Sequence, residues 1–208
     1  NKKIKLGDAS KLDGIEDNSI DLIYTDPPYG DIINYSELNL VWESWLGVSN
    51  NYQNEMIVNK TENKSIDNYF KLFEKFLKEA SRVLKKNKKL VLIFHHPNLI
   101  FWAKLQHILL NSFFTLDMQP LPTRLLSFNK TSSQHKTQKN TQSFIAIELV
   151  NKKKKNIKNI LKLNKNIYDK IRNEGKSANL NSESELYDYL INFCLDKYNL
   201  EDAIKFTS

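Results

Sequence analysis

Cysteine, glycine and proline are scarce in this chain: of its 208 residues, one is cysteine, five are glycine and five are proline. The single cysteine, Cys194, cannot form an internal disulfide, which fits a reducing cytoplasm. Because no cysteine-based zinc cluster can be built from it, we expect no metal site. No apolar run approaches the roughly 20 residues that span a bilayer, and the lysine-rich first residues lead into a short strand pattern instead of a signal peptide. We therefore expect no membrane partner.

Positive charge is in excess. The 31 lysines and arginines outnumber the 24 acidic residues, which gives a net charge of +7. A basic surface attracts phosphate polyanions such as DNA. The same excess also arises from a general bias towards lysine and asparagine, so charge alone leaves both interpretations open. Hydrophobic residues make up 40% and charged residues 26%, which is ordinary for a globular domain with a sizeable core.

The hydrophobic pattern predicts an α/β order of elements. Short apolar runs bounded by turn residues predict strands at residues 4–6, 20–25, 90–94, 113–118 and 144–150. Apolar residues at helical spacing predict helices at 35–45, 65–84 and 98–110. We expect the lysine-rich segment 85–89 to close the second helix, since positive charge suits a helix C-terminus. Strands alternating with helices favour a sheet that is covered by helices.

The last quarter of the chain differs in character. A run of four lysines begins at Lys152, and helical patterns follow at 157–171 and 186–198. We expect two regions: an α/β region over residues 1–150, and a basic linker with a small helical appendage over residues 151–208.

The most specific signal is the tetrapeptide Asp26-Pro27-Pro28-Tyr29, which follows a buried strand. Two prolines cannot continue a sheet ladder, so the strand ends here, and ligands of open α/β sheets bind at the carboxyl ends of strands. A nucleobase amine is a poor nucleophile and needs acceptors for both of its hydrogens. Asp26 offers a charged acceptor and the rigid Pro27 carbonyl offers a second one. Tyr29 offers a flat face for an extruded base. The alternative is a proline-rich turn in which Tyr29 only packs.

Residues 20–29 resemble the catalytic motif of amino-methyltransferases that modify adenine N6 or cytosine N4. In these families Asp-Pro-Pro-Tyr goes mostly with adenine, and a serine in the first position mostly with cytosine. The stretch 26–38, together with Trp42 and Trp45, is similar to the large bacterial and archaeal adenine-specific DNA methylases. Segments 80–85, 90–94 and 142–147 follow the same order, so the resemblance covers about residues 4–150 and not the tail. It implies the catalytic half of a Rossmann-like methyltransferase sheet, S-adenosylmethionine as methyl donor and DNA as substrate.

The resemblance also suggests cofactor contacts. Asp8 looks like the acidic position that these enzymes place near the adenine ring of S-adenosylmethionine, although it also fits a simple turn aspartate. Tyr35 lies just past the catalytic tetrapeptide and either borders a pocket or packs at a helix start.

One family element is missing. The family binds its cofactor with a loop of the Phe-x-Gly-x-Gly kind, and no two of the five glycines here lie close enough to form it. We expect an upstream segment or a second subunit to supply this loop, and the isolated chain to bind S-adenosylmethionine weakly. The third interpretation is that the chain is a non-catalytic remnant of a methyltransferase, which only binds nucleic acid.

A polar segment at 123–141 is a candidate for nucleic-acid binding. Such a loop either grips DNA phosphate or is merely solvated, and the residues that we expect to contact DNA are Arg124, Lys130, Lys136 and Lys139. His95 and His96 end the strand 90–94; we expect turn residues more than pocket-lining ones, and adjacent side chains on an extended segment point to opposite faces, which disfavours a shared metal.

The sequence thus favours a DNA adenine-N6 methyltransferase catalytic region. One alternative keeps the chemistry but changes the substrate to RNA, cytosine N4 or guanine N2. Another is a non-catalytic DNA-binding subunit, against which the intact tetrapeptide argues, since a pure binding subunit has no need of an amine-holding loop. No Pro-Cys pair is present, which argues against cytosine-C5 chemistry.

Overall fold

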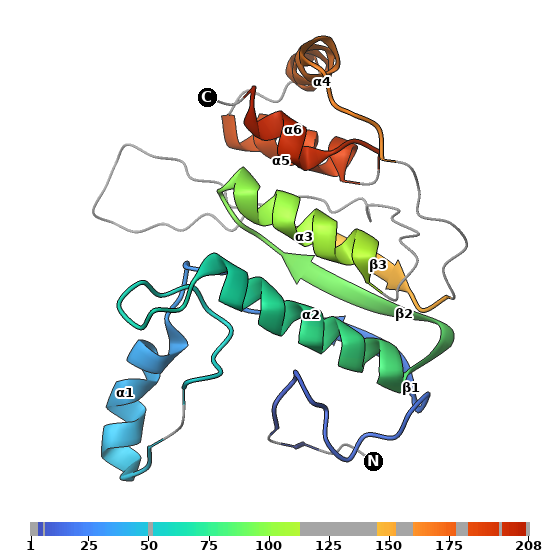
Figure 1. Ribbon diagram of the computed structural model, residues 1–208. Coiled ribbons are helices and arrows are strands. Elements are labelled where there is room, and N and C mark those ends of the chain that lie inside the picture. Colours follow the sequence, from blue (N-terminus) through green and yellow to red (C-terminus); the bar gives the residue numbers. More distant parts are fainter. Residues whose placement is uncertain are drawn as a thin grey trace.

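The computed structural model describes residues 4–5, 7–49, 52–112, 145–152, 160–177, 183–195 and 197–206. In these ranges the elements follow one another as shown in Figure 1: β1 (Ile20–Thr25), α1 (Tyr35–Leu46), α2 (Ile66–Val83), β2 (Leu84–Phe94), α3 (Leu99–Asn111), β3 (Ile145–Val150), α4 (Lys165–Ser177), α5 (Glu183–Cys194) and α6 (Leu200–Ile204). The predicted α/β class is confirmed. None of the described helices is long and apolar enough to cross a membrane.

The described strands form one mixed sheet in the order β1-β2-β3. β1 runs parallel to β2, and β3 is antiparallel to β2. The apolar runs predicted as strands at 20–25 and 90–94 are therefore strands, and so are residues 145–150 of the run predicted at 144–150. Alternate residues of β2, Leu90, Leu92 and Phe94, are fully buried, because this central strand is covered by the helices.

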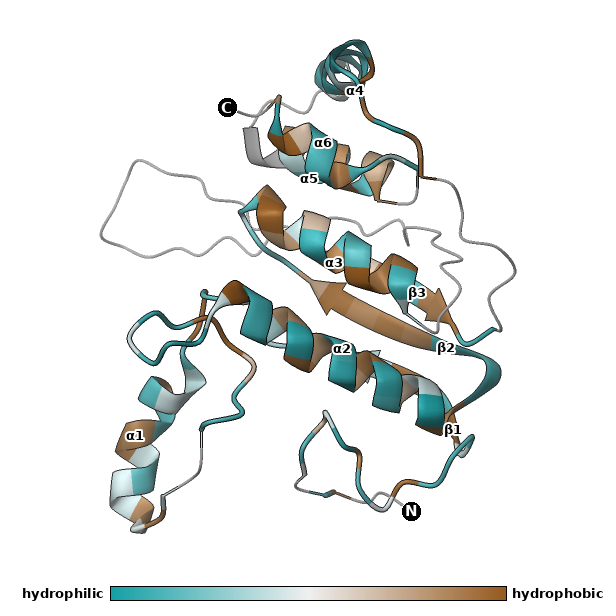
Figure 2. Cartoon of the chain, viewed as in Figure 1, coloured by the Kyte–Doolittle hydropathy of each residue, from teal (hydrophilic) through white to brown (hydrophobic). Residues whose placement is uncertain are grey.

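Helices α2 and α3 cover one face of the sheet (Figure 1). α2 begins after Ser65, whose side chain accepts a hydrogen bond from the Asn68 amide, and α3 begins in the same way after Asn98. The apolar stripe of α2 is turned towards the sheet and its polar residues face outwards (Figure 2), and seven residues of this helix are buried: Tyr69, Phe70, Phe73, Phe76, Leu77, Ala80 and Val83.

The lysine segment 85–89 was predicted to close α2, and that prediction is wrong. The helix ends at Val83, and the lysines belong to β2. The register between β1 and β2 shifts between Ile20 and Leu22, so that residues 85–88 lie opposite Asp21. Lys85 and Lys88 form ion pairs with Asp21, at 2.9 and 3.3 Å. The positive charge is therefore balanced by a neighbouring strand and not by the carboxyl end of a helix.

Three further expectations need correction or lie outside the described residues. Ile4 and Lys5 form no strand, and Ile4 is fully exposed. The helix expected from residue 157 begins only at Lys165, because Leu161 bridges to Tyr198 and Asn164 caps the helix by accepting from the Ile167 amide. The predicted strand 113–118 lies outside the described residues.

The helical tail packs against α3. Gln106, in the middle of α3 and buried, donates to the carbonyls of Leu195 at 2.9 Å and Tyr198 at 2.8 Å, and its side-chain oxygen accepts from the Leu200 amide at 3.0 Å. Apolar residues of the tail belong to the same hydrophobic cluster as the sheet. Among them is Cys194, whose burial raises the pKa of its thiol to about 12. The division of the chain at residue 150 stays a prediction.

Candidate active site

The tetrapeptide Asp26-Pro27-Pro28-Tyr29 leaves the carboxyl end of β1, the first strand of the parallel pair. We call it the 26–29 loop. Pro27 is buried, whereas Asp26 is exposed, so the prolines fix the loop against the body of the protein while the carboxylate faces outwards. This is the position at which open α/β sheets bind ligands.

Tyr29 lies next to Asp26 within the loop. Its hydroxyl donates a hydrogen bond to Oδ1 of Asp26. Its ring packs edge-on against Phe94 and His95, with centroid distances of 5.8 and 6.3 Å. Burial, and then the bond to Asp26, raise the pKa of Tyr29 far above its usual value, so the phenol stays a donor. An ionised carboxylate has acceptor capacity on both oxygens, so Asp26 is able to accept a further hydrogen from an amine.

Tyr69, at the beginning of α2, anchors the middle of the loop. Its hydroxyl donates to the Pro28 carbonyl at 2.6 Å, and its ring is fully buried. Burial raises the pKa of Tyr69 well above its usual value, which keeps this donor protonated. The protein thus binds the carbonyl of Pro28, and the predicted amine acceptor is the preceding carbonyl, that of Pro27.

Gly30 closes the loop by a tight approach to α3. It has a φ of +68°, in the left-handed region that favours glycine, and a side-chain carbon there would overlap the ring of Phe101. Its carbonyl accepts a hydrogen bond of 3.0 Å from the Val58 amide. The chain direction after the 26–29 loop is therefore set by contacts with two other segments.

Both histidines at the end of β2 are buried and reach this loop. The ring of His95 lies edge-on to Tyr29, and Nε2 of His96 is 3.0 Å from Oδ1 of Asp31. The sequence favoured turn residues over pocket-lining residues at these two positions. In the structure, His95 contacts the 26–29 loop at Tyr29, and His96 contacts Asp31 just after the loop. The sequence signal for this was available: the carboxyl ends of adjacent parallel strands lie at the same edge of a sheet.

The hydrogen bond and the ion pair of Asp8 are both made with neighbouring residues of its own turn. Its carboxylate accepts from the Ser10 amide at 2.8 Å and is 3.9 Å from the Lys11 ammonium, as expected of a turn aspartate. The hydrogen bond from Ser10 lowers the pKa of Asp8, and slight burial opposes this effect. Lys75, in the middle of α2, lowers the pKa by a smaller amount. A role for Asp8 in cofactor binding stays a prediction that these contacts do not support.

Tyr35, the other predicted cofactor residue, begins α1 near the 26–29 loop. Burial, and then the Asp26 carboxylate, raise its pKa. Its neighbour along the helix, Ser36, has its amide bound to Glu55 at 3.0 Å. A role for Tyr35 in cofactor binding, like that of Asp8, stays a prediction.

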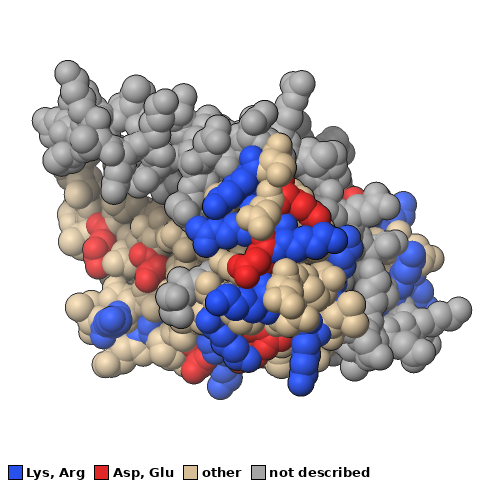
Figure 3. Space-filling model, turned by 90° about the horizontal axis from the view of Figure 1, so that it is seen from above, with Lys and Arg blue, Asp and Glu red and all other residues tan. Residues whose placement is uncertain are grey.

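The predicted DNA contacts Arg124, Lys130, Lys136 and Lys139 lie outside the described residues. On the face seen from above in Figure 3, basic and acidic side chains of the described part are interspersed, so that view shows no surface of a single sign. Within the same part of the chain, no three His, Cys, Asp or Glu side chains are grouped as metal ligands would be.

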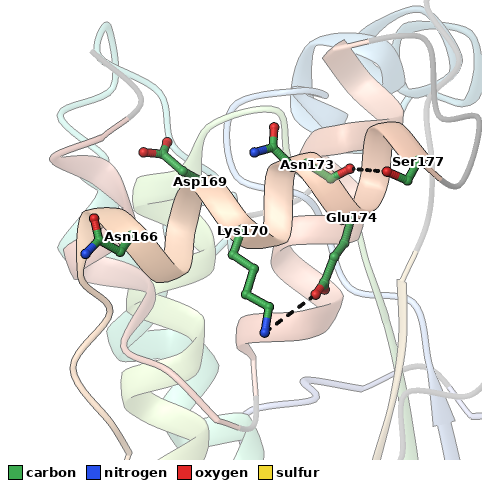
Figure 4. Close-up of a pocket in the computed structure, with 6 residues that line it drawn as sticks. All are labelled: Asn166, Asp169, Lys170, Asn173, Glu174 and Ser177. Atoms are coloured by element: carbon green, nitrogen blue, oxygen red, sulfur yellow. Dashed lines mark hydrogen bonds and ion pairs between the residues drawn. The ribbon is translucent and has the colours of Figure 1, made fainter.

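A polar hollow lies along α4, away from the 26–29 loop in sequence. Figure 4 shows its lining side chains, all from this one helix: Asn166, Asp169, Lys170, Asn173, Glu174 and Ser177. Lys170 pairs with Glu174 at 3.9 Å, and the Ser177 hydroxyl donates to the Asn173 carbonyl at 2.9 Å. Both of these contacts lie within the helix itself, and we assign no ligand to the hollow.

A rigid Asp-Pro-Pro-Tyr loop at the carboxyl end of a parallel strand places the chain among the amino-group methyltransferases. The family model for N6 and N4 methyltransferases, described as DNA methylase, matches residues 20–202. The chain therefore belongs to this DNA methylase family. The match begins at β1 and extends into α6, so it includes the helical tail, to which the sequence resemblance had not been extended.

Solved structures add little to this assignment. Two crystal structures of a candidate DNA modification methylase from Thermus thermophilus are similar at 14% identity. One has a TM-score of 0.39, with 91% of this chain and 73% of that chain covered. The other has a TM-score of 0.36, with coverages of 85% and 64%. None of the curated proteins compared with the chain matches it.

Proposed function

We propose that the chain is the catalytic region of a DNA adenine-N6 methyltransferase. The observation that carries the proposal is the anchored 26–29 loop. Asp26 is exposed at the end of β1, while Tyr69 binds the Pro28 carbonyl. Asp26 and the Pro27 carbonyl accept the two amine hydrogens, which favours the pyramidal form of the nitrogen. Tyr29 stacks on the flipped base, and Asp26, which accepts one hydrogen bond from Tyr29, has acceptor capacity left for the amine. Adenine is preferred over cytosine because the first loop position is aspartate.

The loop is suited to this work because little has to move at the moment of reaction. A preorganised acceptor pair costs no reorganisation and is therefore a large source of transition-state stabilisation. The reaction class uses S-adenosylmethionine, which supplies the methyl group when bound. The described residues hold the substrate amine, and the cofactor is held by groups outside them.

The open edge of β1 supports a location for those cofactor-binding groups. Within the described residues β1 pairs only with β2, and Leu22 and Tyr24 are 58% and 69% exposed. Parallel strands are normally buried on both faces, so this surface fits a neighbouring strand and its helix. We propose that a cofactor-binding segment, from an upstream part of a longer chain or from a second subunit, pairs along this edge.

Methyl transfer to a substrate panel tests the proposed function. The chain, with its upstream sequence or partner restored, is incubated with labelled S-adenosylmethionine and with DNA or RNA that offers adenine, cytosine or guanine amines. We expect transfer to DNA adenine, and loss of at least about 10²-fold in rate for Asp26→Ala, comparable to the removal of one oxyanion-hole donor. Asp67→Ala is the control, because this exposed aspartate forms a surface ion pair with Lys104.

The other outcomes are informative. Transfer to cytosine or to RNA would replace the substrate and keep the chemistry. Salt-sensitive DNA binding without transfer by the wild type would indicate the non-catalytic subunit. Calorimetry with S-adenosylmethionine, on the chain alone and with the added segment, tests the cofactor arrangement: tight binding by the chain alone would contradict it.

A further inference from the structure

The segment that follows the 26–29 loop is held by a buried histidine. Nε2 of His96 is 3.0 Å from Oδ1 of Asp31, and Nδ1 accepts a hydrogen bond of 3.0 Å from the Asn98 amide. Because an amide can only donate, Nδ1 carries no proton and Nε2 carries one, so the imidazole is neutral and donates to Asp31. His96 is 3% exposed, whereas Asp31 is largely exposed. The hydrogen bond from His96 to Asp31, which we call the tether, therefore joins the protein interior to the exposed segment after the 26–29 loop.

The ring of His96 is fixed on its flat face as well. It is stacked on Phe101, with a centroid distance of 3.5 Å and an interplanar angle of 15°. The same Phe101 ring fills the space at Gly30, where a side chain would overlap it. The carbonyl of His96 accepts from the Trp102 indole at 2.8 Å. Contacts with Phe101 and Trp102 of α3 thus fix the orientation of the His96 ring. The same ring contacts the segment after the 26–29 loop through Asp31.

We propose that His96 is a positioning residue, which sets the geometry of the 26–29 loop through Asp31 and through the Phe101 ring under Gly30. It does not touch the substrate. The inference deepens the proposed function and rests on it for its effect on methyl transfer, while the tether itself is measurable without catalysis.

The arrangement requires the neutral imidazole, which makes it dependent on pH. The titratable and charged groups that face His96 are Asp31 from the loop and His95 beside it, and α3 faces it with the uncharged Phe101. Burial lowers the pKa of His96, and this outweighs the opposing effect of Asp31. Protonation would place an N–H of Nδ1 against the Asn98 amide and break that bond. The stability that the bond between Nδ1 and the Asn98 amide contributes is therefore complete above the unfolded pKa of about 6.5 and is lost as the pH falls through the lower folded value.

Two substitutions separate the two halves of the imidazole. The amide nitrogen of glutamine reaches about as far as Nε2, so His96→Gln keeps a donor for Asp31. The side chain of asparagine reaches only as far as Nδ1, so His96→Asn keeps an acceptor for the Asn98 amide and loses the tether. Neither side chain titrates. We expect His96→Asn to lower kcat about 10- to 100-fold with little change in KM, as a small misplacement does. His96→Gln should retain most of kcat and lose the acid limb of the pH profile.

Hydrogen exchange of the Val58 amide reports on the loop independently of methyl transfer, because this amide donates to the Gly30 carbonyl. Measured in the full chain, exchange should accelerate in His96→Asn and Asp31→Ala and stay near the wild-type rate in His96→Gln. Equal exchange in all variants, or equal kcat for the asparagine and glutamine variants, would overturn the proposal. The predicted exchange pattern, in a protein that methylates nothing, would support the tether and refute the proposed function.

Discussion

Replacing Gly30 by alanine should destabilise the protein and displace the 26–29 loop. The residue has a φ of +68°, a conformation that costs a non-glycine residue about 1–2 kcal/mol. The new Cβ would overlap Cε1 of Phe101 and lie 2.8 Å from Cζ and 3.0 Å from Cδ1. The ring cannot yield easily, because His96 is stacked on it. Overpacking of this kind adds about 1–3 kcal/mol, so we expect a total of about 2–5 kcal/mol.

Gly47 supplies the matched control. It ends α1 with a φ of +63°, almost the same as that of Gly30, and no atom lies within 4 Å of the position of an added Cβ. Gly47→Ala therefore carries the backbone cost and the change in unfolded-chain entropy without the collision. The difference between the two variants in urea unfolding, followed by circular dichroism, isolates the steric part at about 1–3 kcal/mol. Equal destabilisation would refute the role of Phe101 in filling the space at Gly30. Unchanged methyl transfer in a folded Gly30→Ala protein would refute the link from this contact to the loop.

Two further substitutions probe the anchors of the loop and of the tail. Tyr69→Phe removes the donor to the Pro28 carbonyl, and it should cost about 1–3 kcal/mol in urea unfolding and lower kcat more than it raises KM; a variant with wild-type kcat would show that this bond does not orient the loop. Gln106→Leu leaves the buried carbonyls of Leu195 and Tyr198 and the amide of Leu200 without their partner, and it should lower the unfolding free energy by about 2–4 kcal/mol. A loss below about 0.5 kcal/mol, typical of a surface substitution, would mean that the apolar contacts alone dock the tail.

The parts of the fold that could be predicted are those that depend on residues close together in the sequence. The strand 20–25 and the loop after it follow from an apolar run that is stopped by two prolines, and α2 follows from its cap and its apolar stripe. The lysines at 85–89 were assigned wrongly, because positive charge after a helical pattern looks the same whether a helix end or a strand follows. What decides between them is Asp21, on another strand.

The parts that could not be predicted depend on contacts between distant residues. The apolar pattern of α1 gives the spacing of Leu38, Trp42 and Trp45 but not their surroundings, and all three are exposed. Asp26, the proposed amine acceptor, is apparent in the sequence, because the motif that suggests its chemistry lies within one tetrapeptide. The residues that support the loop are not apparent, because Tyr69 binds Pro28 across 41 positions of the chain and His96 binds Asp31, just after the loop, across 65 positions.

Gln106 ties the evolution of α3 to that of the tail. A polar side chain in an apolar interface is tolerated only while its partners are present, and here those partners are backbone groups of residues 195–200. Backbone partners do not depend on which side chains the tail carries. The amino-acid sequence of the tail is therefore free to vary, whereas the conformation of its backbone at residues 195–200 is constrained. A relative that has lost the tail should carry an apolar or an exposed residue at the position of Gln106, whereas one that keeps the tail should keep an amide there.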